Sequence, residues 1–322
     1  MNLCDPRTIR DVMSMYGMTF RKELGQNFLT NAAVVEDIAD ACSDTRDATI
    51  LVIDPHVLDK IIAAAEITKD DFVLEIGPGI GVLTQELGMR YRRVLSVEID
   101  RRLVPLLRFT LQDCPPGIVE IINQDFMKAD LHELLDDAFA AGSVSVCANL
   151  PYYITTPILM RLLESGLPFS CITVMVQAEV ADRLCARAGS KDYGAITAVL
   201  NYYGAAEKLF RVPAGNFMPA PKVDSAVVRI RLWQEKPVRP ADEKLFFDTI
   251  RLAFEQRRKT LANALSAGFP DIPKDVLTGI ITDCGHRADI RGERLDTAAF
   301  AALSDRIGIW QAQHPRTQAG AD

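Results

Sequence analysis

The chain has 322 residues, of which 48% are hydrophobic and 25% are charged, and these proportions exclude a disordered or fibrous protein. No apolar run approaches the roughly 18 residues of a spanning helix, and Asp5 and Arg7 lie where a signal peptide would be apolar. We therefore expect a cytoplasmic protein without a membrane partner. The seven cysteines include no C-x-x-C pair, which argues against a disulfide framework and a zinc site, so we expect no metal.

The formal net charge of −7 argues at first sight against a nucleic-acid partner, but the charge is unevenly distributed. Residues 1–206 contain 18 Lys and Arg against 28 Asp and Glu, whereas residues 207–322 contain 18 against 15. The first part therefore carries −10 and the second +3. Such an asymmetry is typical of a protein with one basic domain surface, although a chance excess of three charges would give the same count.

A repeated pattern begins in the N-terminal segment. Residues 34–53 and 57–76 align at an offset of 23, with Ile38 matching Ile61 and Asp47 matching Asp70. Two copies are too few for a solenoid. We interpret the pattern as a duplicated helix–strand unit, and chance similarity between two amphipathic units is the alternative.

Short apolar stretches alternate with helical patterns from residue 57 to about residue 205. The predicted strands are 71–76, 93–99, 119–124, 143–148 and 171–177. Apolar residues at three-to-four spacing predict helices over 83–91, 101–112, 131–141 and 157–166. This alternation implies an open, mainly parallel α/β sheet with helices on both faces.

Beyond residue 233 the sequence changes to amphipathic helical patterns alone. These patterns cover 243–268, 273–285 and 295–308, with no strand between them. We therefore predict an N-terminal segment over 1–56, a Rossmann-like domain over 57–233, a small all-helical domain over 234–310 and a flexible tail over 311–322. The helical domain coincides with the more basic part of the chain.

A glycine-rich turn, EIGPGIG over 75–81, follows the first predicted strand of the domain. Its glycines let the backbone approach a ligand, and the following helix offers free N–H groups. A dinucleotide fingerprint would need a third glycine at position 82, which is Val82. The pattern instead resembles the first motif of class I S-adenosylmethionine-dependent methyltransferases.

Two carboxylates end the next two predicted strands. Glu98 lies where it can accept both ribose hydroxyls of a nucleoside, and Asp125 can accept from an adenine amino group with Ile99 and Phe126 on either side of the ring. Each acid alone could equally be a solvated side chain at a strand end. Because ligands bind at the carboxyl ends of parallel strands, the glycine turn and both acids together predict a nucleoside pocket.

The stretch ANLPYYITTPI, residues 148–158, follows the fourth strand of this series. Its Asn149, Leu150, Pro151 and Tyr152 match the Asn/Asp-Pro-Pro-Tyr type of motif found in methyltransferases that act on exocyclic amines. The Asn149 side chain and the carbonyl of Leu150 or Pro151 would hold the amine for in-line displacement, and Tyr152 would stack on an extruded base. The alternative is that Asn149 caps the next helix and Tyr152 only packs.

The sequence as a whole resembles the KsgA family, the small-subunit ribosomal RNA adenine dimethyltransferases, from about residue 8 to residue 305. The stretches that carry the resemblance are RKELGQNFL (21–29), EIGPGIGVLT (75–84), VEID (97–100), ANLPYYITTPI (148–158), MVQAEVADRL (175–184), NFMPAPKVDSAVVR (216–229), AFEQRRKTLANAL (253–265) and RGERL (291–295). It implies a class I methyltransferase fold with a helical C-terminal domain. The implied activity is dimethylation of N6 on two adjacent adenosines near the 3′ end of 16S rRNA during ribosome assembly.

The resemblance also implies roles for individual residues. The residues expected to contact S-adenosylmethionine are Asn27, Leu29, Gly77, Glu98, Asp125 and Asn149. The target base would be held by residues 149–152, with Phe217 on its other face. The residues expected to dock the rRNA backbone are Arg251, Arg257, Arg258, Lys259, Arg291 and Arg294, although an exposed arginine-rich helix face would look the same.

The implied partner is 16S rRNA within a 30S subunit or its precursor, and we expect a monomer. The chain departs from the family between Leu29 and Gly77, where relatives have one helix–strand unit and this chain has two. Either copy could take the native place. If the extra unit is 30–53, residues 26–29 must return across it to reach the cofactor.

Three other functions fit parts of the sequence. Large-subunit adenine methyltransferases of the macrolide-resistance type share the glycine turn and the Asn-x-Pro-Tyr motif, but AFEQRRKTLANAL and RGERL favour the small-subunit type. A noncatalytic RNA-binding assembly or transcription factor would not need both motifs intact. A DNA adenine methyltransferase is disfavoured because Leu150 replaces the usual proline and no module for reading DNA sequence is evident.

Overall fold

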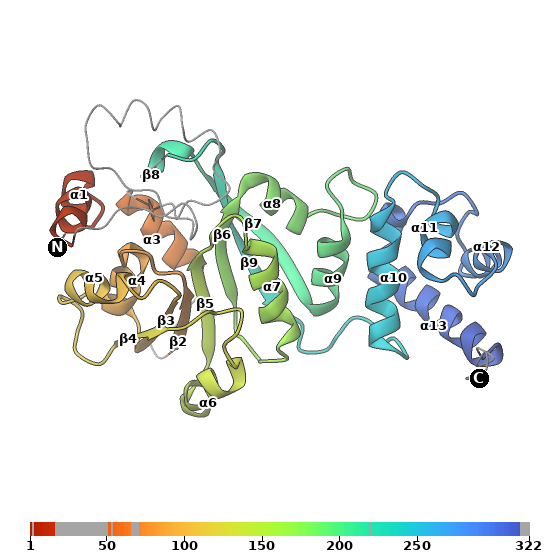
Figure 1. Cartoon of the computed structure of the whole chain (residues 1–322), viewed down its shortest axis with the longest axis horizontal. Helices are drawn as coiled ribbons and strands as arrows, with labels where there is room; N and C mark the ends of the chain where they lie inside the picture. The colour runs from red at the N-terminus through yellow and green to blue at the C-terminus, as the bar shows by residue number, and fades with distance from the viewer. Residues whose placement is uncertain (2, 17–50, 53, 66–70, 219, 316–322) are drawn as a thin grey trace, which may run out of the picture. The chain divides into compact units, whose positions relative to one another are not determined.

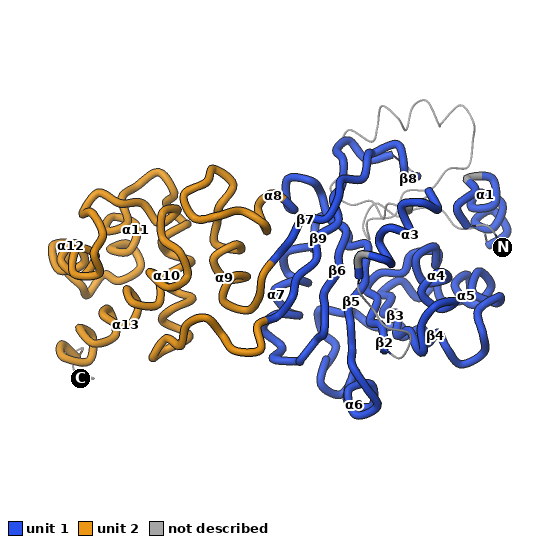
Figure 2. The backbone as a smooth tube through the Cα atoms, turned by 180° about the vertical axis from the view of Figure 1, so that it is seen from behind, with its two compact units in different colours: residues 1–181, 206–232 blue, residues 182–205, 233–322 orange. Residues whose placement is uncertain are grey.

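The computed structural model describes residues 1, 3–16, 51–52, 54–65, 71–218 and 220–315. The chain divides into two compact units, of which unit 1 comprises residues 1–181 and 206–232 and unit 2 comprises residues 182–205 and 233–322 (Figure 2). Asn27, Leu29, most of the first repeat copy and residues 316–322 of the predicted tail lie outside the described residues.

Unit 1 is built around a seven-stranded sheet of order β4-β3-β2-β5-β6-β9-β7 (Figure 1). Its five parallel strands confirm the predicted ones within two residues at each end: β2 (Phe72–Ile76), β3 (Arg93–Glu98), β4 (Val119–Asn123), β5 (Val144–Asn149) and β6 (Ile172–Gln177). The sequence analysis missed β9 (Ser225–Leu232), which pairs antiparallel with β6, and β7 (Gly204–Val212) at the sheet edge. The predicted mainly parallel α/β fold is confirmed.

The strands and helices follow directly from the residue pattern. Every side chain of β2 is buried, which suits the apolar run of a central parallel strand. The predicted helices are α4 (Val82–Arg90), α5 (Leu103–Thr110), α6 (Leu131–Ala141) and α7 (Thr155–Glu164), and a short helix, α8 (Ala178–Leu184), follows β6. Asp130 caps α6 by accepting from the backbone N–H groups of His132 and Glu133.

The repeat copies have different fates. The second copy forms α3 (Pro55–Ala64) and β2, so it supplies the central strand of the sheet. The described end of the first copy is β1 (Leu51–Val52), which pairs antiparallel with β8 (Phe217–Met218) in a separate two-stranded sheet. The second copy therefore leads into the glycine turn, and β1 lies outside the seven-stranded sheet.

One large apolar cluster joins the N-terminal helices to the sheet. It contains Ile9 and Val12 of α1 (Pro6–Met15), Leu58 of α3 and Leu87 of α4, packed with sheet residues such as Val73. Both α1 and α3 begin at an aspartate cap followed by proline, a typical helix start. The two helices therefore belong to the core of unit 1.

Unit 2 is helical. It contains α9 (Ala195–Tyr203), α10 (Glu243–Glu255), α11 (Leu261–Gly268), α12 (Lys274–Asp283), α13 (Thr297–Gln313) and the short 3₁₀ turn η4 (Gly292–Arg294). The stretch 243–268, expected to be helical, is interrupted between α10 and α11, where the amide of Leu261 bonds the carbonyl of Ile290.

The unit boundaries differ from the predicted domain boundaries. Residues 182–205 belong to unit 2, because Ala198 and Tyr202 of α9 are buried in one cluster with Phe246 and Ile250 of α10. The chain thus leaves unit 1 within α8, after Ala181, and returns to it within β7, at Ala206. Apolar periodicity could not reveal this excursion, since an α/β pattern and a helical domain both contain amphipathic helices.

Within RGERL, Gly292 is a point of close backbone packing in unit 2. A Cβ atom there would lie 2.8 Å from the Ala253 Cβ and 2.9 Å from the Ala253 carbonyl oxygen. We expect Gly292→Ala to lower the free energy of unfolding of unit 2 by about 1–3 kcal/mol through overpacking. Urea denaturation followed by circular dichroism measures this change.

Gly279, inside α12, is the matched control, because its Cβ would meet no atom within 4 Å. Gly279→Ala should raise the free energy of unfolding by about 0.5–1 kcal/mol through helix propensity. Equal effects of the two substitutions would contradict the close contact at Gly292.

Candidate functional site

A pocket opens at the carboxyl ends of four parallel strands in unit 1. Gly77 and Gly79 follow β2, Glu98 and Ile99 end β3, and a third part of the lining follows β4. The remaining lining residues are Ile76, Val97, Gln124, Asp125, Phe126, Met127, Pro151, Tyr153, Ile154 and Ile158. Because β2 and β5 are neighbours although two strands separate them in the sequence, the pocket lies at the topological switch point.

The glycine turn forms one wall of this pocket. Gly77, Gly79 and Gly81 all have positive φ angles, of 70°, 61° and 92°. Residues that carry a Cβ atom are strained at positive φ, so the turn depends on glycine. The amide of Gly77 bonds the carbonyl of Val97, which fixes the turn against the end of β3.

Glu98 supplies a buried carboxylate to the pocket. Its side chain is 4% exposed, and its Oε1 accepts from the amide of Asp100 at 2.7 Å. Burial raises the pKa of Glu98 to about 7, although hydrogen bonds from neighbouring amides oppose the shift. A carboxylate kept largely from water is suited to accept hydroxyl groups, as predicted for a ribose.

The residues predicted to hold an adenine ring line the same pocket. Asp125 Oδ1 accepts from the amide of Met127 at 2.9 Å, and its Oδ2 lies 3.6 Å from the Lys128 ammonium. Ile99 is 51% exposed while Phe126 is buried, and both line the pocket. The structure thus brings together Asp125 and the two side chains expected to hold a planar ring.

The Asn-Leu-Pro-Tyr motif, residues 149–152, begins at the last residue of β5 and lies beside the same pocket. The Pro151 carbonyl already accepts from the amide of Ile154 at 3.2 Å and from the Thr155 hydroxyl at 3.0 Å. No described residue donates a hydrogen bond to the Leu150 carbonyl. The Leu150 amide donates to the carbonyl of Met175. Of the two carbonyls considered from the sequence, the geometry therefore favours Leu150 as a partner for an amine.

The two aromatic residues predicted to stack on a base are held by the core of unit 1. The Tyr152 hydroxyl lies 2.6 Å from the Ser225 hydroxyl at the start of β9, and its ring packs against the large apolar cluster. Phe217, in β8, is 3% exposed and belongs to the same cluster. Neither ring presents an open face comparable with that of Tyr153, which is 48% exposed.

Sequence reasoning missed part of the pocket and one buried acid. Tyr153, Ile154 and Ile158 line the pocket because α7 begins directly after the motif, a signal that the helical pattern around 157–166 contained. Glu75 is fully buried, and its Oε2 accepts from the Ser96 hydroxyl at 2.6 Å. Burial raises the pKa of Glu75 to about 7.

The six basic residues predicted to dock RNA all lie in unit 2, but they differ in their partners. Arg251 pairs with Asp248 at 2.9 Å and with Glu255. Arg257 pairs with Glu293 at 3.2 Å and donates to the carbonyl of Lys191. Both arginines therefore have carboxylates nearby that reduce the charge they offer. The exposed residues of the set also include Arg258, Lys259, Arg291 and Arg294.

The described residues contain no group of three or more His, Cys, Asp or Glu arranged to hold a metal ion. Within the same part of the chain, no helix is long and apolar enough to cross a membrane.

Comparison with known proteins places this geometry among RNA methyltransferases. A family model described as "Ribosomal RNA adenine dimethylase" matches residues 45–283. Ribosomal RNA small subunit methyltransferase A from Lachnoclostridium phytofermentans is 45% identical over 309 residues, which are 95% of this chain and 97% of that protein. The protein of the same name from Bacillus cereus is 42% identical over the same shares.

Solved structures agree with this similarity. A dimethyladenosine transferase from Plasmodium falciparum superposes with a TM-score of 0.64 at 26% identity, covering 78% of this chain and 94% of that one. The 23S rRNA methyltransferase ErmE superposes with a TM-score of 0.59 at 28% identity, covering 79% and 98%.

The raised pKa of Glu98 predicts a pH dependence for the binding of S-adenosylmethionine. Only the ionised carboxylate accepts two ribose hydroxyls, so affinity should rise by roughly tenfold between pH 6 and pH 8, as Glu98 ionises. Isothermal titration calorimetry at several pH values measures the change. Glu98→Gln should bind more weakly at pH 8 and lose most of this dependence.

Glu75 remains in both proteins, so its own titration near pH 7 cancels in the comparison. Wild-type affinity that does not vary between pH 6 and pH 8 would contradict a ribose-binding role for the Glu98 carboxylate.

Proposed function

This chain belongs to the ribosomal RNA adenine dimethylase family, and from this membership we propose that it methylates N6 of two adjacent adenosines near the 3′ end of 16S rRNA. Four methyl groups are transferred in all, from S-adenosylmethionine. The observation that carries the proposal is the presence of Glu98, Asp125 and the Asn149 motif around one pocket edge. The protein is an S-adenosylmethionine-dependent rRNA methyltransferase.

The described residues fit this cofactor. The glycine turn allows the backbone to approach a ligand closely, and the buried Glu98 carboxylate suits a ribose. Gly77, Glu98, Asp125 and Asn149 would hold the cofactor, and the proposed contacts of Asn27 and Leu29 concern residues outside the described ones. When bound, S-adenosylmethionine supplies an electrophilic methyl group on a sulfonium.

The chain contributes mainly positioning to the reaction. Adenine N6 is a poor nucleophile because its lone pair is delocalised into the ring. Asn149 and the Leu150 carbonyl would each accept one N6 hydrogen, which directs the nitrogen lone pair along the line of displacement. The Pro151 carbonyl accepts hydrogen bonds from Ile154 and Thr155. These bonds fix the turn that carries the Asn149 side chain and the Leu150 carbonyl.

Tyr152 and Phe217 would hold the extruded base between them. Base–aromatic stacking contributes roughly 1–3 kcal/mol per base. The hydroxyl contact between Tyr152 and Ser225 orients the tyrosine ring, and β8 positions Phe217 in the same apolar cluster. Phe217 is buried and Tyr152 is half-buried, so admission of a base requires the side chains around them to move.

Unit 2 would dock the rRNA backbone. Arg258, Lys259, Arg291 and Arg294 are the strongest candidates, because Arg251 and Arg257 are ion-paired within the unit. Phosphate contacts of this kind position the protein on its RNA without reading sequence. We infer a cytoplasmic, monomeric enzyme that acts on a 30S subunit or its precursor.

The small subunit is favoured over the large one by the curated relatives. Those with 42–45% identity over 95% of the chain are named small subunit methyltransferases, whereas the 23S rRNA methyltransferase ErmE is 28% identical. The shared pocket explains why both kinds of enzyme align with this chain.

The direct test is mass spectrometry of rRNA from under-methylated ribosomal particles incubated with the protein and isotopically labelled S-adenosylmethionine. We expect labelled dimethyladenosine at two adjacent positions near the 3′ end of 16S rRNA. Asn149→Ala should reduce labelling at least about 100-fold through lost orientation of the amine, while the fold measured by circular dichroism is retained.

Label in 23S rRNA alone would contradict the proposed substrate and show that the protein is a methyltransferase of the large-subunit type. Unchanged turnover of Asn149→Ala would remove this residue from the amine-binding role even if the substrate assignment held.

A further inference from the structure

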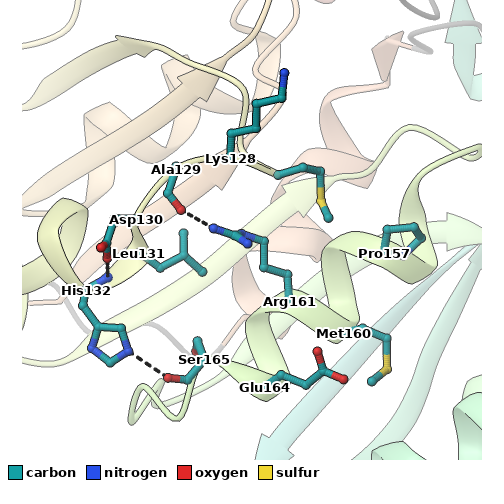
Figure 3. A pocket seen from close by; sticks show the side chains of 11 residues that line it. Lys128, Ala129, Asp130, Leu131, His132, Pro157, Met160, Arg161, Glu164 and Ser165 are labelled. Atoms are coloured by element: carbon teal, nitrogen blue, oxygen red, sulfur yellow. Dashed lines mark hydrogen bonds between the residues drawn. The ribbon is translucent and has the colours of Figure 1, made fainter. Parts of the chain in front are cut away.

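Unit 1 contains a second cavity (Figure 3). Its volume is about 560 Å³, within the range of ligand-binding pockets. One wall is the segment 127–132, which runs from the loop after β4 into the first turn of α6, and the other wall is α7. Met127 lines both cavities, so the two sites are neighbours.

Arg161 crosses this cavity from α7 and is incompletely satisfied. Its Nη2 donates to the Ala129 carbonyl, as Figure 3 shows. Its Nε is buried and has no hydrogen-bond acceptor among the described residues. A half-buried cation with an unsatisfied N–H donor favours an anionic ligand.

Lys128 adds a second, more mobile positive charge. Its side chain is 83% exposed, and its ammonium lies 3.6 Å from Asp125 Oδ2, a distance of weak pairing. In Figure 3 its side chain extends from the segment 127–132 with the ammonium directed away from Arg161. A ligand phosphate at Arg161 would meet this second cation when the exposed Lys128 side chain turns toward the cavity.

The acids of the cavity are placed differently from these cations. Asp130 is engaged as the cap of α6, where it accepts from two amides. Glu164 follows Arg161 by three residues on α7 and lies at the end of the lining opposite Lys128 (Figure 3). His132 Nε2 lies 2.9 Å from the Ser165 carbonyl and links the two walls.

The remaining lining is apolar and follows the same helix. Ile154 and Ile158 line the cofactor pocket, whereas Pro157 and Met160 line the second cavity. Helix α7 starts at Thr155, just after the motif 149–152 proposed to hold the target base. An RNA strand whose target base lies at Asn149 can therefore continue along this helix. Pro157 and Met160 would then offer apolar contact to a base or ribose.

We propose that the second cavity binds a nucleotide that flanks the target adenosine in the rRNA strand. Lys128 and Arg161 hold its phosphodiester, and its base or sugar lies against Pro157 and Met160. The proposal rests on the proposed function, because it takes the ligand to be the substrate strand. A flanking site of this kind keeps the strand bound while one adenosine replaces its neighbour at Asn149.

The test is RNA binding by the full chain, measured by fluorescence anisotropy with a fluorescein-labelled six-nucleotide oligoadenylate at several salt concentrations. Loss of one phosphate contact should lower the slope of log affinity against log salt by about 0.7. We expect this change for Lys128→Gln, with affinity at low salt reduced about 3–10-fold. Glu164→Gln should act in the opposite direction and tighten binding about twofold.

Lys60→Gln is the matched control, because Lys60 is an exposed lysine of α3 outside both cavities. Indistinguishable slopes for Lys128→Gln and Lys60→Gln would overturn the proposal. Adenosine monophosphate is the second probe. Its binding to wild type but not to Lys128→Gln, with an unchanged RNA slope, would assign the cavity to a free nucleotide and also overturn it.

This experiment separates the two proposals. Oligoadenylate binding requires no methyl transfer, so it can succeed even if 16S rRNA is not labelled. Calorimetry of S-adenosylmethionine binding to Lys128→Gln detects an indirect effect through Asp125. A loss of cofactor affinity that accompanies an unchanged RNA slope would place Lys128 in the cofactor site and contradict the flanking site.

Discussion

The shared edge of the parallel strands is the constraint on which the structure depends. Strands β2, β3, β4 and β5 run parallel, so the residues that follow each strand meet along one edge, although they are separated by up to about 70 positions in the chain. The glycine turn follows β2, Glu98 and Asn149 are the last residues of β3 and β5, and Asp125 lies two residues after the end of β4. A change of strand order would separate them.

Two buried carboxyl groups near this edge of the sheet reduce the stability of the fold when they are ionised. Glu75 and Glu98 both have a pKa of about 7 because burial disfavours the charged form. A group whose pKa is raised on folding loses its contribution to stability between the unfolded and the folded value, so both acids make the fold less stable as pH rises from about 4.5 to about 7. The hydrogen bond from Ser96 to Glu75 limits this cost, and a bound ribose would do the same for Glu98.

The sequence predicted β2, β3, β5 and β6 well because nearly all their side chains are buried and form short apolar runs, whereas the side chains of β4 are only half-buried or exposed. It missed β7, whose exposed and half-buried residues give no continuous apolar signal. It predicted the pocket acids because each stands at a strand end. It could not show that the Pro151 carbonyl is engaged or that Arg257 pairs with Glu293, since these contacts depend on the turn geometry and on residues 36 positions apart.

Hydrogen–deuterium exchange with and without S-adenosylmethionine tests the central claim most directly, because it locates the ligand along the chain. The account predicts slower exchange, by at least about tenfold at saturating ligand, in residues 77–81, 98–100 and 125–127, with α10 to α13 unchanged. Protection confined to the helices of unit 2, or ligand binding without protection at these three strand ends, would contradict a cofactor site at the edge of the sheet.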